Sequence, residues 1–292
     1  MAIAAVGQIC STASLSHNLE QCLKVLFLPE ASDYIASSPQ ESIFLAQPQS
    51  SSPFVLGLQN AAKTHSLAIN VGIHVLKPPE SRATSTSTSS TPPTKLLNRS
   101  LWINPDGTIN HPATYDKLHL FDYGALRESA TVRSGTSLTP PFATPIGRVG
   151  SLICFDLRFP EPALALTHPG PSSPWLRTGP AQVLLYPSAF TVRTGTAHWE
   201  PLLRARAIET QSWVVAAAQV GAHNAKRSSY GHSMVVDPWG VVRLELGGVD
   251  AEGNAEEGAE GAVGFVDVDL DEWARVREGM PLVRRNDVYS EL

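Results

Sequence analysis

Residues 149–161 read Val149-Gly150-Ser151-Leu152-Ile153-Cys154-Phe155-Asp156-Leu157-Arg158-Phe159-Pro160-Glu161. The apolar run over 149–153 is typical of a buried strand, and Pro160 suits the first turn of a helix that continues through Glu161. Cys154 is therefore expected where a strand gives way to a helix. Free backbone N–H groups and the helix dipole can favour a thiolate there and hold an oxyanion. A buried, inert cysteine is the alternative, and position alone leaves the two interpretations about even.

The segments on either side of this stretch alternate between strand-like and helix-like patterns. This alternation predicts an α/β fold, and no internal repeat divides the chain, so we expect one domain over residues 1–292. The strand-like segments are 3–9, 24–30, 67–76, 101–109, 181–186, 213–220 and 233–237, and the helix-like segments are 17–23, 53–65, 161–166 and 198–210.

Three insertions of low complexity interrupt the pattern, near 77–94, 167–180 and 247–261. The first is rich in Pro, Ser and Thr and cannot bury enough apolar surface to offset its ordering entropy, so it is expected to be a mobile loop. Because strand-like residues flank it, we interpret it as an elongated hairpin connection. The third is acidic and glycine-rich, but it lacks the strand-to-helix context of a phosphate-binding loop.

Composition excludes several classes of protein. The net charge of −5, with no basic block, argues against a nucleic-acid partner. Three cysteines without C-x-x-C spacing make a disulfide framework or a thiolate zinc site unexpected, and favour a reduced compartment. No apolar run reaches the roughly 18 residues of a membrane span. The apolar start lacks the charged region of a signal peptide, since the first basic residue is Lys24, and predicts the first strand of a cytoplasmic protein.

A cysteine nucleophile needs a base and an oxyanion site. Nothing like the C-G-S-C-W motif of papain-like proteases surrounds Cys154, none of the nine histidines stands out, and no H-E-x-x-H metal motif occurs. Glu30 ends a strand-like segment and Lys117 lies inside another. Buried charges are costly unless paired, so we expect these two side chains to meet. A solvated Lys117 on an exposed face is the alternative.

Three motifs carry a family resemblance: Leu28-Pro29-Glu30, Tyr115-Asp116-Lys117-Leu118-His119, and the stretch 152–161. Together they resemble the Glu-Lys-Cys motifs of the nitrilase superfamily of carbon–nitrogen hydrolases, and they occur in the family's order. The resemblance covers nearly the whole chain apart from the three insertions. Within the superfamily, segments 204–211 and 229–240 look most like the Nit amidase branch, and there like the deaminated-glutathione amidases.

This resemblance implies a four-layer αββα sandwich whose subunits pair through helices as a homodimer or higher homo-oligomer. It implies that Cys154 is the nucleophile, Glu30 the general base and acid, and that Lys117 and the backbone N–H of Phe155 hold the oxyanion. Glu128 matches a second glutamate that supports the site, with a solvated loop carboxylate as the alternative. No cofactor and no metal is implied.

The implied reaction is hydrolysis of a 2-oxo-acid amide, with deaminated glutathione cleaved to α-ketoglutarate and cysteinylglycine. The alternatives are ω-amidase action on 2-oxoglutaramate, nitrile hydrolysis, which the motifs fit less well, and a non-catalytic interaction protein that keeps the fold. Arg158 lies about one helical turn beyond Cys154 and has the planar fork that suits a carboxylate. A local pair with Glu161 or Asp156 is its alternative, and Phe190 and Thr194 are expected to line the same pocket.

One feature departs from the family pattern. Only 17–23 is available as a helix between the first two strands, about 10 Å at roughly 1.5 Å per residue. A buried strand of five or six residues is roughly 17–20 Å long. Either loop rebuilds the crossover, or the sequence lacks a segment that its natural relatives carry, in which case Glu30 is displaced. The second possibility favours the non-catalytic alternative.

Overall fold

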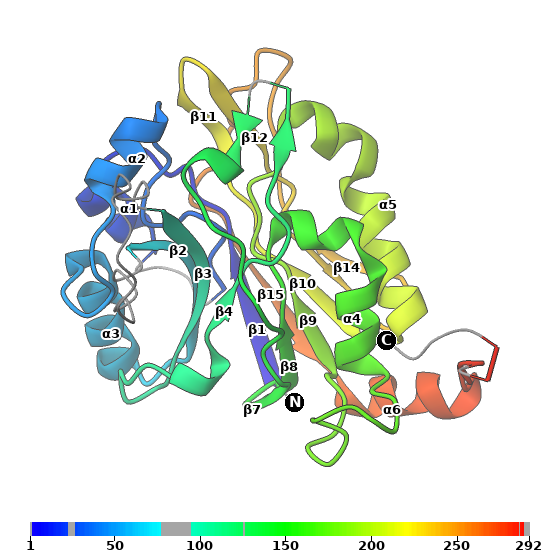
Figure 1. Ribbon diagram of the computed structural model, residues 1–292. Coiled ribbons are helices and arrows are strands. Elements are labelled where there is room, and N and C mark those ends of the chain that lie inside the picture. Colours follow the sequence, from blue (N-terminus) through cyan, green and yellow to red (C-terminus); the bar gives the residue numbers. More distant parts are fainter. Residues whose placement is uncertain (1, 23–26, 77–94, 125, 286, 289–292) are drawn as a thin grey trace, which may run out of the picture.

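The computed structural model describes residues 2–22, 27–76, 95–124, 126–285 and 287–288. Two β-sheets pack face to face, and helices cover the outer face of each sheet (Figure 1). The layers are therefore helix, sheet, sheet and helix, and the predicted αββα sandwich is confirmed. Across the described residues, no helix combines the length and apolar character that crossing a membrane requires.

The first sheet joins the two ends of the described chain. Its strands are β1 (Ala2–Gly7), β15 (Val263–Val268), β2 (Ile69–Leu76), β3 (Leu96–Ile103) and β4 (Tyr115–Asp116). β1 pairs with β15 and β3 pairs with both β2 and β4, all antiparallel. Phe27 forms parallel bridges to Val6 and Asn70 and so connects β1 to β2. Lys117 directly follows β4, and Glu30 follows the Phe27 segment, so both residues lie at the same edge of this sheet.

The second sheet has the order β14-β13-β10-β9-β8-β7. β8, β9 and β10 are parallel to one another, so their carboxyl ends lie at one edge. The strand bounds are β7 Phe142–Thr144, β8 Gly147–Ser151, β9 Val183–Leu185, β10 Trp213–Ala216, β13 Met234–Val236 and β14 Val242–Glu245.

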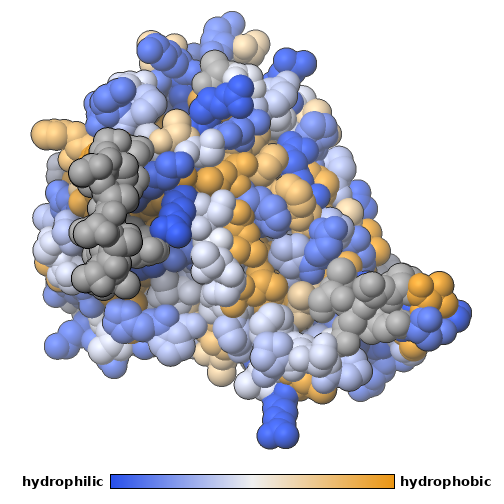
Figure 2. Space-filling view, in the orientation of Figure 1, coloured by the Kyte–Doolittle hydropathy of each residue, from blue (hydrophilic) through white to orange (hydrophobic). Residues whose placement is uncertain are grey.

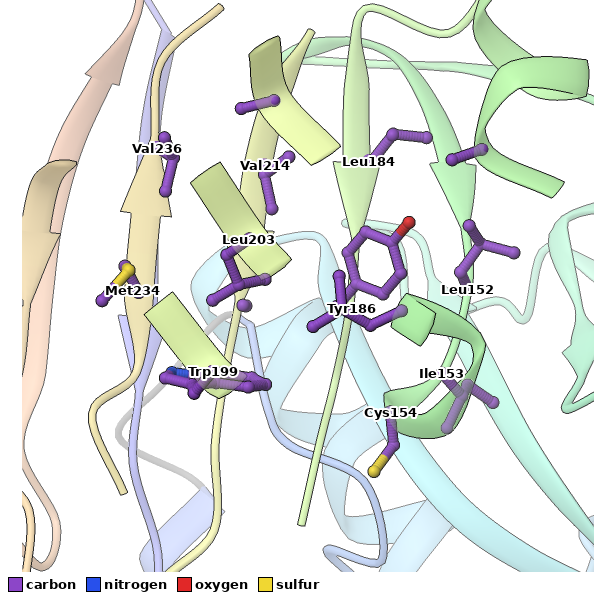
Figure 3. Packing of buried hydrophobic residues seen from close by; sticks show 14 of the residues in the cluster. Leu152, Ile153, Cys154, Leu184, Tyr186, Trp199, Leu203, Val214, Met234 and Val236 are labelled. Atoms are coloured by element: carbon purple, nitrogen blue, oxygen red, sulfur yellow. The ribbon is translucent and has the colours of Figure 1, made fainter. Parts of the chain in front are cut away.

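The three largest apolar clusters among the described residues hold the four layers together. One lies between the sheets and includes Val6, Trp102 and Trp213. A second lies under the helices α1 (Leu15–Cys22) and α3 (Pro53–His65), where apolar side chains at helical spacing form one buried stripe on α3. The third lies under α4 (Pro160–Thr167) and α5 (Val192–Thr210), and Figure 3 shows Trp199 and Leu203 of α5 packed over this sheet.

The remaining elements lie outside the two main sheets and the helices α1, α3, α4 and α5. They are the helices α2 (Pro39–Leu45) and α6 (Leu270–Gly279), the hairpin strands β5 (Asp122–Tyr123), β6 (Leu126–Arg127), β11 (Val220–Asn224) and β12 (Arg227–Tyr230), and the 3-10 helices η1 (His111–Ala113), η2 (Glu128–Ala130) and η3 (Cys154–Arg158).

Several predicted boundaries differ from the structure. α5 starts at Val192 rather than at residue 198, because the Thr191 side chain accepts a hydrogen bond from the Thr194 N–H and caps the helix. The strand predicted over 213–220 ends at Ala216 and the chain resumes as β11. The helix after the cysteine strand starts at Pro160, as predicted, and the short η3 that precedes it was not predicted.

The three insertions have different outcomes. Residues 77–94 lie outside the described residues, but Leu76 pairs with Leu96, so the hairpin connection is confirmed. The insertion near 167–180 packs against the domain through the Trp175 indole N–H, which donates to the Ala165 carbonyl at 2.9 Å. The insertion near 247–261 is tied to the residue directly after β1, because the Gln8 side chain donates to the carbonyls of Gly247 and Ala259.

Candidate active site

Cys154 occupies a strained position directly after β8. Its φ of +45° lies in the left-handed region, which is unfavourable for a residue with a side chain. The Cys154 N–H donates to the Pro187 carbonyl at 3.1 Å, so the loop after β9 helps to hold this backbone. Figure 3 shows Cys154 at the border of the apolar cluster, with its sulfur directed away from the packed residues. The local geometry thus presents the thiol at the edge of the sheet.

Asp156 fixes the cysteine loop to the lysine segment. Its carboxylate is fully buried and accepts hydrogen bonds from the Ile153 N–H at 2.9 Å and from the Tyr115 hydroxyl at 2.7 Å. It also accepts from the backbone N–H of His119 at 3.0 Å. Tyr115 and His119 flank Lys117 by two residues on each side, so one carboxylate sets the relative position of Cys154 and Lys117.

Lys117 lies between two carboxyl groups. Its Nζ is 2.8 Å from Oε1 of Glu30 and 2.8 Å from Oε2 of Glu128. The Lys117 side chain is only 2% exposed, so the alternative of a solvated lysine is wrong. Glu128 also accepts from the backbone N–H of Phe121 at 2.7 Å, so it is not a solvated loop carboxylate. Glu30 is buried and lies within the cluster, which excludes the displacement that the short crossover suggested.

Asn98 on β3 is a site residue that the sequence reasoning missed. Its side-chain N–H₂ donates to Glu30 Oε1 at 2.6 Å and to Glu128 Oε1 at 2.9 Å, so it bridges the two carboxylates. The sequence pattern Asn98-Arg99-Ser100 suggests only a glycosylation sequon. The available signal was the apolar run on either side of Asn98, which marks it as a polar residue inside a buried strand.

The charges of the cluster determine its protonation state. Burial works against the charge of Lys117, but the carboxylates of Glu128 and Glu30 raise its pKa well above the usual range. Burial likewise opposes ionisation of Glu30, but Lys117 and hydrogen bonds from Cys154 and Asn98 lower its pKa. Burial and the Glu30 carboxylate raise the pKa of Cys154. The resting cluster therefore holds a neutral thiol beside a carboxylate that can accept its proton.

A cavity of about 520 Å³ opens over this cluster. Arg158, Phe190 and Thr194, expected from the sequence to contact substrate, all line it together with Glu30, Lys117, Glu128, Cys154 and Phe155. The Arg158 guanidinium donates to His198 Nδ1 at 3.1 Å and lies 5.7 Å from the ring centres of Phe155 and Phe190. The alternative pairing of Arg158 with Asp156 is not found, because the Asp156 carboxylate accepts from Ile153, Tyr115 and His119. The volume suits a small organic molecule.

The described side chains include no group of three or more His, Cys, Asp or Glu residues that is arranged to hold a metal ion.

Comparison with known proteins identifies similarity to carbon–nitrogen hydrolases. The family model described as carbon-nitrogen hydrolase matches residues 4–278. The chain is 41% identical to the probable hydrolase nit2 of Schizosaccharomyces pombe, over 100% of both chains. It is 37% identical to the deaminated glutathione amidase of Homo sapiens, over 99% of this chain and 84% of that protein.

Among solved structures, the NitFhit protein of C. elegans superposes with a TM-score of 0.80 at 38% identity. The match covers 99% of this chain and 66% of the length of that one.

Proposed function

Since the chain belongs to the carbon–nitrogen hydrolase family, we propose that it cleaves the amide bond of deaminated glutathione, releasing α-ketoglutarate and cysteinylglycine. The contact of Glu30 with both Lys117 and Cys154 beside a cavity of about 520 Å³ supports this proposal most strongly. Four relatives that carry the amidase name, at 36–37% identity over 99% of this chain, support the choice of substrate.

In the first half-reaction, Glu30 accepts the thiol proton as Sγ of Cys154 bonds to the amide carbonyl carbon. The proton must move to Glu30 in this step, because a thiolate next to two carboxylates and one ammonium would leave a buried site with two excess negative charges. The Lys117 ammonium and the Phe155 N–H hold the oxyanion, and one such donor is typically worth about 3 kcal/mol. Glu30 then gives its proton to the leaving amine as the C–N bond breaks.

In the second half-reaction, Glu30 takes a proton from water, and the hydroxide attacks the thioester carbonyl. The C–S bond breaks, the acid leaves, and Glu30 returns the proton to the Cys154 thiolate. Glu128 and Asn98 keep Lys117 and Glu30 in register through both steps. Arg158, which lines the cavity beside Phe190 and Thr194, grips the 2-oxo carboxylate of the acyl half.

A second candidate activity is ω-amidase action on 2-oxoglutaramate, which has the same acyl half and loses ammonia in place of a dipeptide. Because Arg158 would bind that acyl half in both substrates, the catalytic cluster does not separate them. The size of the cavity favours the larger substrate.

The test is release of α-ketoglutarate by the purified protein from deaminated glutathione and from 2-oxoglutaramate. We expect a higher kcat/KM with deaminated glutathione and no turnover by the Cys154→Ala variant. Turnover of 2-oxoglutaramate alone would establish the second candidate. If the folded protein turns over neither deaminated glutathione nor 2-oxoglutaramate, the result would favour the alternative of a non-catalytic interaction protein.

We also propose that the chain forms homodimers or higher homo-oligomers through the α5 and α6 faces. Ile208, Trp239 and Met280 lie near these helices and are 44%, 60% and 41% exposed. Burying such large apolar side chains against a second copy is favourable. Light scattering of the wild type should give a mass of at least two chains, and Trp239→Asp should lower it. A monomeric wild type would contradict the proposal.

A cytoplasmic location is proposed on the basis of the cysteines. Cys10, Cys22 and Cys154 are all free, and a thiol nucleophile is preserved in a reducing compartment. Fluorescent fusions at either end should distribute through the cytoplasm, and concentration in a secretory or organellar compartment would contradict this.

A further inference from the structure

The hairpin β11–β12 forms part of the cavity wall through its turn. Asn224, Lys226 and Arg227 line the cavity although they lie about seventy residues after the cysteine. The hairpin is attached to the site, since the Tyr230 N–H donates to the Phe190 carbonyl at 2.9 Å and Thr191 is bridged to Ser229. Arg227 lies two residues beyond that bridge, roughly 7 Å along the strand. The turn therefore stands at the rim, at the top of the view in Figure 1.

The hairpin is held by buried polar contacts that contribute no positive charge. His223 Nδ1 lies 2.8 Å from the Ser11 carbonyl, which can only accept, so this nitrogen carries the proton. His223 Nε2 then accepts from the Ser229 hydroxyl at 2.7 Å. Burial lowers the pKa of His223 to about 3, so the imidazole is neutral. The positive charge of the turn belongs to Lys226 and Arg227.

Among the described residues, the Lys226 ammonium and the Arg227 guanidinium have no hydrogen-bond or ion-pair acceptor. Elsewhere arginines pair with carboxylates, as Arg99 does with Asp116 at 2.6 Å. Within the described part of the chain, no carboxylate lies within 4.0 Å of the charged nitrogens of Lys226 or Arg227. The Asn224 Oδ1 accepts from the Lys226 N–H at 3.0 Å, which orients the amide, and the Asn224 Nδ2 is buried without a partner among the described residues. Figure 2 shows mostly hydrophilic side chains at the top of this face.

We infer that the β11–β12 turn is a second carboxylate subsite, in which Arg227, Lys226 and Asn224 bind the terminal carboxylate of the leaving group. This inference rests on the proposed function. Deaminated glutathione has one carboxylate on its 2-oxo-acid half and a second on the glycine of the departing dipeptide. Arg158 lines the cavity from η3, and Lys226 and Arg227 line it from the hairpin turn, so the cavity wall has cationic groups on two elements for the two carboxylates. An arginine fork, an ammonium and an amide N–H₂ are the donors that a carboxylate takes.

This subsite selects the substrate by its leaving group. Ammonia, lost from 2-oxoglutaramate, has no carboxylate for the turn to hold, so the turn favours amides of acidic amines. Because the glycine carboxylate lies far from the reacting carbonyl, its contact is equal in the ground state and the transition state. Loss of the contact should therefore raise KM and leave kcat nearly constant.

The test compares deaminated glutathione with an analogue whose glycine carboxylate is a carboxamide. For Arg227→Gln we expect KM for deaminated glutathione to rise about tenfold, a typical loss for one charged hydrogen bond. The wild type should show a similar rise with the analogue, and the variant with the analogue should show no further loss. Lys226→Gln changes an exposed side chain and should give a smaller rise in KM for deaminated glutathione. This variant tests the subsite even if Arg227→Gln does not fold.

Arg193→Gln is the matched control, because Arg193 is exposed at the start of α5, carries the same charge and does not line the cavity. If the hairpin variants raise KM equally for deaminated glutathione and for its carboxamide analogue, or raise neither, the subsite is overturned and the proposed function stays intact. A loss of the same size in Arg193→Gln also overturns it, because the general field of the protein would then explain the effect. If the wild type turns over neither deaminated glutathione nor the carboxamide analogue, the proposed function is overturned, and the subsite is overturned with it.

Discussion

Replacing Lys117 by methionine tests the buried charge cluster directly. The substitution keeps much of the side-chain volume but removes the ammonium that lies 2.8 Å from both Glu30 and Glu128. The two carboxyl groups then keep the Asn98 amide, the Phe121 N–H and the Cys154 thiol as partners, and none of these carries a positive charge. Removing one member of a buried ion pair typically costs about 3–5 kcal/mol. At about 2 °C per kcal/mol for a chain of this size, the expected loss in Tm near neutral pH is about 6–10 °C.

The loss should depend on pH with a defined sign. In the wild type, burial opposes the charge of Glu30, but Lys117 holds the pKa of Glu30 below its usual range. That carboxylate therefore stabilises the fold above its unfolded pKa, and the stabilisation disappears as the pH falls through its folded pKa. Without Lys117, burial raises the pKa of Glu30, so its contribution is present at low pH and is lost as the pH rises. The deficit of the variant should shrink on acidification.

Scanning calorimetry of both proteins at about pH 5 and about pH 7.5 measures this deficit. Lys63→Met is the control, because Lys63 is exposed on α3 and its loss should change Tm little at either pH. A deficit that stays constant between the two pH values, or that grows on acidification, would refute the account of the Glu30–Lys117 pair.

Three further predictions concern the thiols, the substrate carboxylate and the first insertion. Limiting iodoacetamide should abolish activity only as Cys154 becomes modified, since Cys154 lines the cavity beside Glu30, which can accept its proton, whereas Cys10 and Cys22 are buried away from the cavity; full activity with Cys154 alkylated, by mass spectrometry, would contradict the mechanism. Arg158→Lys should lower kcat/KM for deaminated glutathione well beyond any loss of Tm, because an ammonium cannot form the planar fork; an unchanged kcat/KM in folded protein would place the carboxylate elsewhere. Replacing residues 80–94 by a short glycine-containing turn should leave Tm and activity nearly unchanged, because loop length costs little free energy; a large loss of either would show that these residues contact the domain.

Much of the fold and the central cluster could be predicted because both leave local signals. Apolar runs mark the strands, and a glutamate and a lysine stand out because charges are rare in such runs. These signals indicated that Glu30 and Lys117 meet, and the structure has their charged atoms 2.8 Å apart. The motif order then supplied the family, which the carbon-nitrogen hydrolase match over residues 4–278 confirms.

The sequence did not reveal the residues that act through long-range pairing. Asn98 becomes a site residue only because β3 lies beside β4, which brings its amide between two glutamates. The turn of β11–β12 reaches the cavity only because β12 is bonded to the segment after β9. Neither contact follows from spacing along the chain. The αL conformation of Cys154 was equally hidden, because cysteine has no intrinsic preference for it.

The antiparallel pairing of β1 with β15 has a consequence for synthesis of the protein on the ribosome. Ala2 pairs with Val268, so β1 waits for a partner made more than 260 residues later. At roughly 5–20 residues per second, that wait is roughly 13–53 s. Throughout it, the apolar β1 has one edge without its final hydrogen-bond partner, and such an edge readily pairs with other chains. Chains released before Val263 never acquire that partner, so premature termination should yield aggregation-prone products that chaperones or proteases must clear.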